Sequence, residues 1–144
     1  MVSLRSVSIL FATIVIFHFA AIIRHWYWTV RWFDIPMHYL GGVFSAMVFY
    51  WLFSEAIAIL SDQKVPFWVL FAFALGWVAL IGVVWELSEY ASDMILLGRM
   101  EVIERAQQGM RDTMEDLSLD LLGGASVAVF LRFRYNRTEG APRA

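Results

Sequence analysis

Four runs of apolar residues dominate this chain, and each is close to the length at which a helix crosses a lipid bilayer. A spanning helix needs roughly 20 predominantly apolar residues. The expected spans cover about residues 7–23, 35–60, 65–90 and 115–133. The last is the weakest, because its uncharged stretch is short. The pattern predicts an all-α membrane protein, a bundle of four transmembrane helices.

Composition supports the same class. The 144 residues are 60% hydrophobic, which is more than a small soluble domain can hide in one core. We expect a single membrane domain over residues 1–133 and a basic, disordered tail over 134–144. The chain has no cysteine, which excludes disulfides and thiolate metal sites. Its net charge of −2 gives no reason to expect a nucleic-acid partner.

Charge distribution suggests an orientation. Arg132 and Arg134 directly follow the last span, where the positive-inside bias acts most strongly. We therefore expect a multi-pass protein of the bacterial inner (cytoplasmic) membrane with both termini in the cytoplasm. The long connection over residues 91–113 has apolar residues three or four apart. This spacing predicts an amphipathic helix on the membrane surface, with a mobile loop as the alternative.

One nine-residue phrase occurs twice, at residues 34–42 and 116–124. Each copy carries two polar residues four positions apart, followed by a glycine pair, at the start of an apolar run. This repetition fits duplication of a two-helix unit. Glycine pairs also let neighbouring helices approach closely. We therefore expect spans two and four to contact each other through these glycines.

Polar residues gather where three of the expected spans meet one membrane face. At about 100° per residue, the members of each group lie on one side of their helix. The groups are Asp34 and His38; Glu86 and Glu89; and Asp112, Asp116 and Asp120. Ionisable residues inside a membrane are costly and mark functional sites. The sequence thus predicts a carboxylate-and-histidine site at the outer membrane face.

Three interpretations of this site remain open. In the first, oxygen ligands and one imidazole bind a divalent metal: zinc, manganese, iron or magnesium. The metal would be held by His38, Glu86, Glu89 and Asp116, with Asp120 supporting them from below; Asp34 and Asp112 would orient the ligands or act as a general base. In the second, the carboxylates share protons, as in a carrier. In the third, they form structural ion pairs with Arg24, Arg31 and Arg111.

The same residues resemble a known family. Asp34, His38 and Gly42, then Glu86 and Glu89, then Asp112, Thr113, Asp116 and Gly123 follow the order found in YjdF-type bacterial inner-membrane proteins. The resemblance covers residues 34–124. It implies a polytopic inner-membrane protein with a polar site, and the related VanZ-like group implies a role in the cell envelope.

Three functions follow from these observations. The leading hypothesis is a metal-dependent membrane enzyme acting on a lipid or another small envelope precursor. The alternatives are a proton- or cation-coupled carrier and a non-catalytic scaffold whose charges set helix register. A homodimer is one assembly that would enclose the site.

Overall fold

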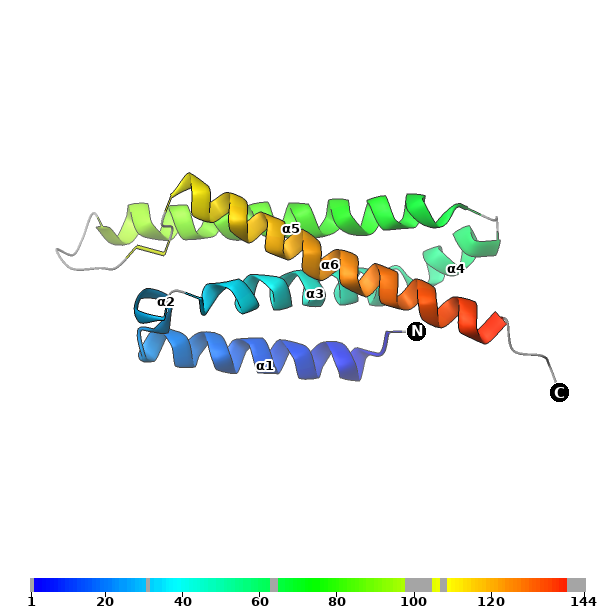
Figure 1. The fold of residues 1–144 in the computed structure, drawn as a ribbon, viewed down its shortest axis with the longest axis horizontal. Coiled ribbons are helices and arrows are strands. Elements are labelled where there is room, and N and C mark those ends of the chain that lie inside the picture. Colours follow the sequence, from blue (N-terminus) through cyan, green and yellow to red (C-terminus); the bar gives the residue numbers. More distant parts are fainter. Residues whose placement is uncertain (1, 31, 63–64, 98–104, 107–108, 140–144) are drawn as a thin grey trace.

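The computed structural model describes residues 2–30, 32–62, 65–97, 105–106 and 109–139, and helices are the regular secondary structure throughout these ranges. This confirms the predicted all-α class. Figure 1 shows the helices, which are α1 (Leu4–Ile23), α2 (Trp26–Thr29), α3 (Asp34–Leu52), α4 (Ser54–Asp62), α5 (Phe67–Leu97) and α6 (Met110–Glu139).

Three helices are long and apolar enough to cross a membrane within the described residues: Leu4–Ile23, Asp34–Leu52 and Phe67–Ile95. The expected fourth span, residues 115–133, lies inside α6. That helix has 30 residues and is long enough to cross a bilayer. It is not among the three apolar spans because its first turns carry the charged residues of the candidate site.

The expected span over residues 35–60 is divided into two helices. The backbone leaves helical geometry at Phe53, and α4 begins at the next residue. Helices usually break at proline or glycine, and neither stands here. Instead, the Phe53 ring packs 5.1 Å from Phe49 and 5.9 Å from Trp77 between ring centroids. This aromatic packing belongs to the tertiary structure and has no sequence signal.

The connection over residues 91–113 differs from the predicted surface helix. Helix α5 continues through Leu97 and α6 begins at Met110, so both ends of this segment extend the neighbouring helices. Residues 98–104 and 107–108, where the rest of the prediction falls, lie outside the described residues. Residues 134–139 of the predicted disordered tail are helical, because α6 continues to Glu139, and residues 140–144 lie outside the described residues. No proline or glycine stands between Gly124 and Gly140, so the sequence offers no break in this stretch.

Helix α3 is the centre of the bundle, with α1, α5 and α6 packed against it. Figure 1 shows α6 crossing α3 and α5 obliquely. At the crossing, a side chain on Gly42 would meet the backbone of Asp120, and one on Gly123 would meet the carbonyl of Tyr39. The glycine pairs thus bring the two backbones into direct contact, as the sequence predicts.

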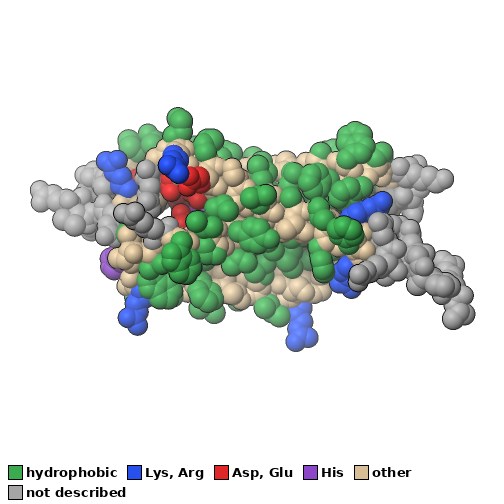
Figure 2. All heavy atoms as spheres, in the orientation of Figure 1, with side chains coloured by type: hydrophobic (Ala, Val, Ile, Leu, Met, Phe, Trp, Pro, Cys, Tyr) green, Lys and Arg blue, Asp and Glu red, His purple; other side chains and the backbone are tan. Residues whose placement is uncertain are grey.

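On the face drawn in Figure 2, apolar side chains are spread over the middle of the bundle. Large hydrophobic residues on α1 and α5 are widely exposed; Ile16, for example, has a relative exposure of 67%. In water such a surface would be an aggregation hazard. It is the surface expected of helices that face lipid chains.

Candidate functional site

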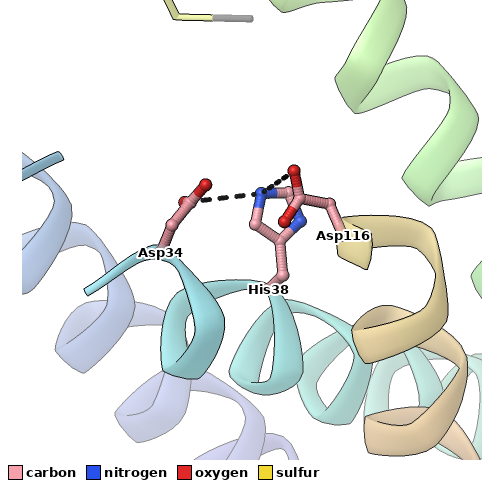
Figure 3. Close-up of side chains that lie close together, drawn as sticks. All are labelled: Asp34, His38 and Asp116. Atoms are coloured by element: carbon pink, nitrogen blue, oxygen red, sulfur yellow. Dashed lines mark ion pairs between the residues drawn. The ribbon is translucent and has the colours of Figure 1, made fainter. Parts of the chain in front are cut away.

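The candidate site forms where the start of α3 meets the start of α6. His38 and Asp34 lie one turn apart on α3, and the His38 Nε2 atom is 3.6 Å from an Asp34 carboxylate oxygen. The same nitrogen is 3.8 Å from a carboxylate oxygen of Asp116 on α6. Figure 3 shows the imidazole between the two carboxylates. One ligand atom from each of these residues lies within 4.8 Å of the others.

Asp120 contacts the other side of the same ring. Its carboxylate lies 3.7 Å from the Nδ1 atom of His38. Asp116 and Asp120 are one turn apart on α6, so a single helical face presents both carboxylates to one imidazole. His38, Asp116 and Asp120 are all buried. The structure therefore gives each ring nitrogen of His38 a carboxylate neighbour.

Glycines make room for the Asp120 carboxylate. A Cβ on Gly82 of α5 would lie 2.7 Å from an Asp120 oxygen, and one on Gly41 of α3 would lie 3.5 Å from the other oxygen. Three helices therefore approach one carboxylate group closely. Any side chain at Gly82 would have to displace it.

The two glutamates of α5 occupy different environments. Glu86 is only 6% exposed, and neither carboxylate oxygen has a hydrogen-bond partner among the described residues. It lies close enough to Asp34, Asp116 and Glu89 for mutual electrostatic repulsion. Glu89 instead accepts a hydrogen bond of 2.9 Å from the indole of Trp85. A buried carboxylate without a partner is costly, so Glu86 is a candidate for contact with a cation.

The remaining predicted residues lie at the edge of the site. Asp112 is half-buried one turn before Asp116, within electrostatic range of Asp34 and Asp116. Arg111, one of the three arginines in the ion-pair interpretation, forms an exposed ion pair of 2.8 Å with Glu115. Arg31 lies outside the described residues. Among the ion pairs found for Asp116, the partner is His38 rather than an arginine.

Sequence reasoning missed the role of His18 and Tyr27, which are hydrogen-bonded at 2.8 Å. Burial raises the pKa of the Tyr27 phenol, and the nearby Asp34 and Glu89 carboxylates raise it further. The phenol therefore stays protonated beside the acidic site. No sequence spacing reveals this pair, because it depends on the fold-back from α1 into α2.

Asp93 is a second missed residue. It is buried and accepts a hydrogen bond of 3.0 Å from the backbone N–H of Ala106. It follows Glu86 by two helical turns, so it lies on the same face of α5. That periodicity is the signal that could have identified it. The contact holds the described part of the α5–α6 connection against α5.

A cavity of about 350 Å³ adjoins the site. His18, Tyr27, Asp34, His38, Glu89 and Asp120 supply the polar and ionisable side chains at one end. The rest of the lining comes chiefly from apolar residues of α1, α3 and α5, among them Phe11, Val15, Phe44, Val78 and Ile81. The candidate site is thus open to an apolar pocket rather than sealed inside the bundle.

Comparison with known proteins assigns the chain to a family but does not indicate a reaction. The model of the family described as "Predicted membrane protein (DUF2238)" matches residues 2–137. An uncharacterized protein of Thermotoga maritima is 31% identical over 121 residues, which cover 83% of this chain and 58% of the relative. The chain therefore spans little more than half of that protein. No solved structure matches. The predicted relation to VanZ-like proteins stays a prediction.

Proposed function

The chain belongs to the DUF2238 family of predicted membrane proteins, the YjdF-like family, and from the geometry of its site we propose that the His38 site binds a divalent metal ion. The protein would use this ion as a membrane enzyme acting on a lipid or another envelope precursor. Asp34, His38 and Asp116 supply the ligand atoms. One observation carries the proposal: the two nitrogens of His38 face different carboxylates.

The two ring nitrogens of His38 have different carboxylate neighbours, as is usual for a histidine that binds a metal. A ligating histidine binds through one nitrogen and donates its other N–H to a carboxylate, which sets the tautomer and the ring orientation. Here Nε2 faces Asp34 and Asp116, and Nδ1 faces Asp120. Asp120 is then the orienting carboxylate, not a ligand. This refines the expected supporting role of that residue.

The donor spacing supports the same proposal. In a tetrahedral site, metal–ligand bonds of about 2.0–2.2 Å place two donors roughly 3.3–3.6 Å apart. The two distances from His38 Nε2, 3.6 and 3.8 Å, lie close to the upper end of that range. The three donors lie within 4.8 Å of one another, so small side-chain rotations would bring all of them to one ion. Oxygen and nitrogen donors without sulfur suit zinc, manganese, iron or magnesium.

Charge supplies a second argument. Asp34, Asp116 and Asp120 place three carboxylates around one imidazole. Glu86 lies within electrostatic range of Asp34 and Asp116 and has no hydrogen-bond partner among the described residues. A divalent cation offsets this accumulation of negative charge and gives the Glu86 oxygens a neighbour of opposite sign. Glu86 is therefore either a fourth ligand or a carboxylate that a small rearrangement brings to the ion.

The chemistry available to such a site is Lewis-acid catalysis. A bound divalent ion polarises a phosphoryl or carbonyl oxygen of a substrate and orients the attacking water. Glu89 and the protonated Tyr27 line the same pocket. They are placed to accept and donate hydrogen bonds at the substrate's polar group. Asp112, at the edge of the site, is the remaining candidate for a general base.

The carrier alternative has less support in the described residues. A carrier needs polar groups along a path through the membrane. The second groove, at the opposite end of the bundle between α3, α4 and α5, is lined by apolar and aromatic residues such as Phe49, Phe53 and Trp68. The polar cluster thus has no polar counterpart in that groove.

Elemental analysis of the detergent-purified protein tests the proposal. We expect close to one zinc, manganese or iron per wild-type chain, and loss of that metal in Asp116→Asn. Glu115→Gln is the matched control, because it removes the neighbouring but exposed carboxylate. Magnesium binds more weakly, so each sample is also titrated with Mg²⁺ by calorimetry. Equal metal binding by all three proteins, or none in the wild type by either method, would refute the metal site.

A further inference from the structure

The apolar pocket beside His38 gives the substrate class of the proposed enzyme. We propose that this pocket holds a hydrocarbon chain of a phospholipid that enters sideways from the bilayer between α1 and α5. The lipid head group then lies at the polar end, next to Asp34, His38 and Glu89. This inference rests on the proposed function only for the fate of the head group; lipid binding itself does not require the metal.

The pocket is polar at one end and mainly apolar elsewhere, which suits an amphiphilic ligand. One end carries carboxylates, two imidazoles and a phenol, while the remainder is lined mainly by aliphatic and aromatic side chains. Its volume of about 350 Å³ lies within the range of roughly 300–1,000 Å³ usual for small-molecule sites. A soluble, fully polar precursor would leave the apolar part without a partner. A lipid fills both parts.

The length of the pocket matches one leaflet. Along α3 the lining runs from Asp34 to Ser45, and along α5 from Val78 to Glu89. At the helical rise of about 1.5 Å per residue, each stretch covers about 16 Å. The hydrocarbon core of a bilayer is about 30 Å thick, so the pocket reaches from the polar end to about the middle of the membrane. This is the depth occupied by a chain of a single leaflet.

The helices that line the pocket indicate that a lipid chain enters it laterally, between α1 and α5. Its apolar lining comes from α1 and α5, with α3 between them. Helix α1 packs closely against α3, whereas it packs less extensively against α5 in the described part of the chain, and the rings of His18 and Trp85 meet at the polar end. Phe11 lines the pocket from α1 and Ile81 lines it from α5, and both are exposed, so the pocket is open on this side. A chain can enter there while its head group stays at the interface.

Two pairs of substitutions test this inference. Val15 lines the pocket from α1, whereas the adjacent Ile16 is 67% exposed and faces away. On α5, Ile81 lines the pocket, and Leu80 lines the second groove instead. Tryptophan at Val15 or Ile81 fills the pocket. Tryptophan at Ile16 or Leu80 adds the same bulk outside it and serves as the control.

Native mass spectrometry of delipidated protein, titrated with dioleoyl phosphatidylethanolamine, provides the readout. We expect one retained lipid per chain in the wild type, I16W and L80W, and at least about fivefold lower occupancy in V15W and I81W. Metal content is measured on the same samples and is expected to be unchanged. Thermal unfolding identifies any variant that does not fold. If a variant of one pair does not fold, the test rests on the other pair of substitutions.

Each outcome supports or overturns the inference. Equal lipid occupancy in all folded variants, or no retained lipid in the wild type at excess lipid, overturns it whatever the metal content. A pocket covered by a second copy of the chain would give a dimer without lipid, which also overturns it. Selective loss of lipid in V15W and I81W supports the inference, even where the protein binds no metal and the proposed function fails.

Discussion

Gly42 of α3 lies directly against the backbone of Asp120 in α6, so a Cβ at this glycine would overlap the Asp120 carbonyl. The contact sets the distance between the two helices that carry the candidate site. Four residues before Gly42 is His38, whose imidazole faces Asp120 and Asp116. The glycine crossing therefore positions the histidine of one helix against the carboxylates of the other.

Substitution Gly42→Ala should separate α3 from α6. Overpacking a core costs about 1–3 kcal/mol, and the cost here is at the upper end or above, because the neighbour is backbone that cannot rotate away. We expect a lower melting temperature in detergent and loss of metal binding. Gly76→Ala is the control, because a Cβ at Gly76 has open space. An unchanged melting temperature in Gly42→Ala would contradict the close contact between Gly42 and the backbone of Asp120.

Glu86→Gln should act in opposite directions with and without metal. In chelator-treated protein the change removes a buried, unpaired charge, so the free energy of unfolding should rise on the order of 1 kcal/mol. In the metal-loaded protein it should weaken the metal affinity roughly tenfold or more. The exposed Glu55→Gln is the control for both measurements. A drop in stability without metal would show that Glu86 has a partner after all.

His38 and Asp120 should be energetically coupled. Their side chains lie 3.7 Å apart and are buried, and contacting residues typically show coupling energies of about 0.5–3 kcal/mol. A double-mutant cycle with His38→Ala and Asp120→Asn measures this by chemical unfolding of metal-free protein. The exposed Arg111–Glu115 pair is the comparison and should show no resolvable coupling. Additive effects at His38 and Asp120 would argue against the orienting role of Asp120.

Tyr27→Phe should reduce the sensitivity of the protein to alkaline pH. Because the pKa of Tyr27 is raised in the folded protein, the folded state keeps this proton at pH values where the unfolded chain, with a tyrosine pKa of about 10, loses it. The stabilisation that the raised pKa of Tyr27 provides is fully present below the unfolded-state pKa of about 10. It is lost as the pH rises above that value. Melting temperatures between pH 8 and 11 should therefore fall less steeply in the variant. Parallel curves for the two proteins would contradict the buried phenol.

The same substitution removes the hydrogen bond between Tyr27 and His18. A typical protein hydrogen bond contributes about 0.5–1.5 kcal/mol, so Tyr27→Phe should also lower stability modestly at neutral pH. Tyr50→Phe is a suitable control on α3, away from the acidic cluster. An effect at neutral pH no larger than that of the control would show that the bond is not maintained in the membrane.

Some parts of the site could be predicted from helical periodicity. Asp34 and His38 are four residues apart, as are Asp116 and Asp120, and both spacings place the pair on one helical face. The contact between glycine pairs was also predictable, because small residues in spanning helices mark close approach. Local spacing could not show that Glu86 is unpaired while Glu89 bonds Trp85, since this depends on the rotation of α5 against its neighbours.

The sequence by itself determined that the chain is helical and belongs in a membrane, because bilayer thickness demands long apolar runs and those runs are visible in one dimension. It also determined which carboxylates share a helical face. Only the tertiary structure decided that His38 lies between Asp34, Asp116 and Asp120, that α3 ends at Leu52, and that an apolar pocket opens beside the site. The physical reason is that these features depend on the rotation and crossing of packed helices, and residues distant in sequence set that geometry through their contacts.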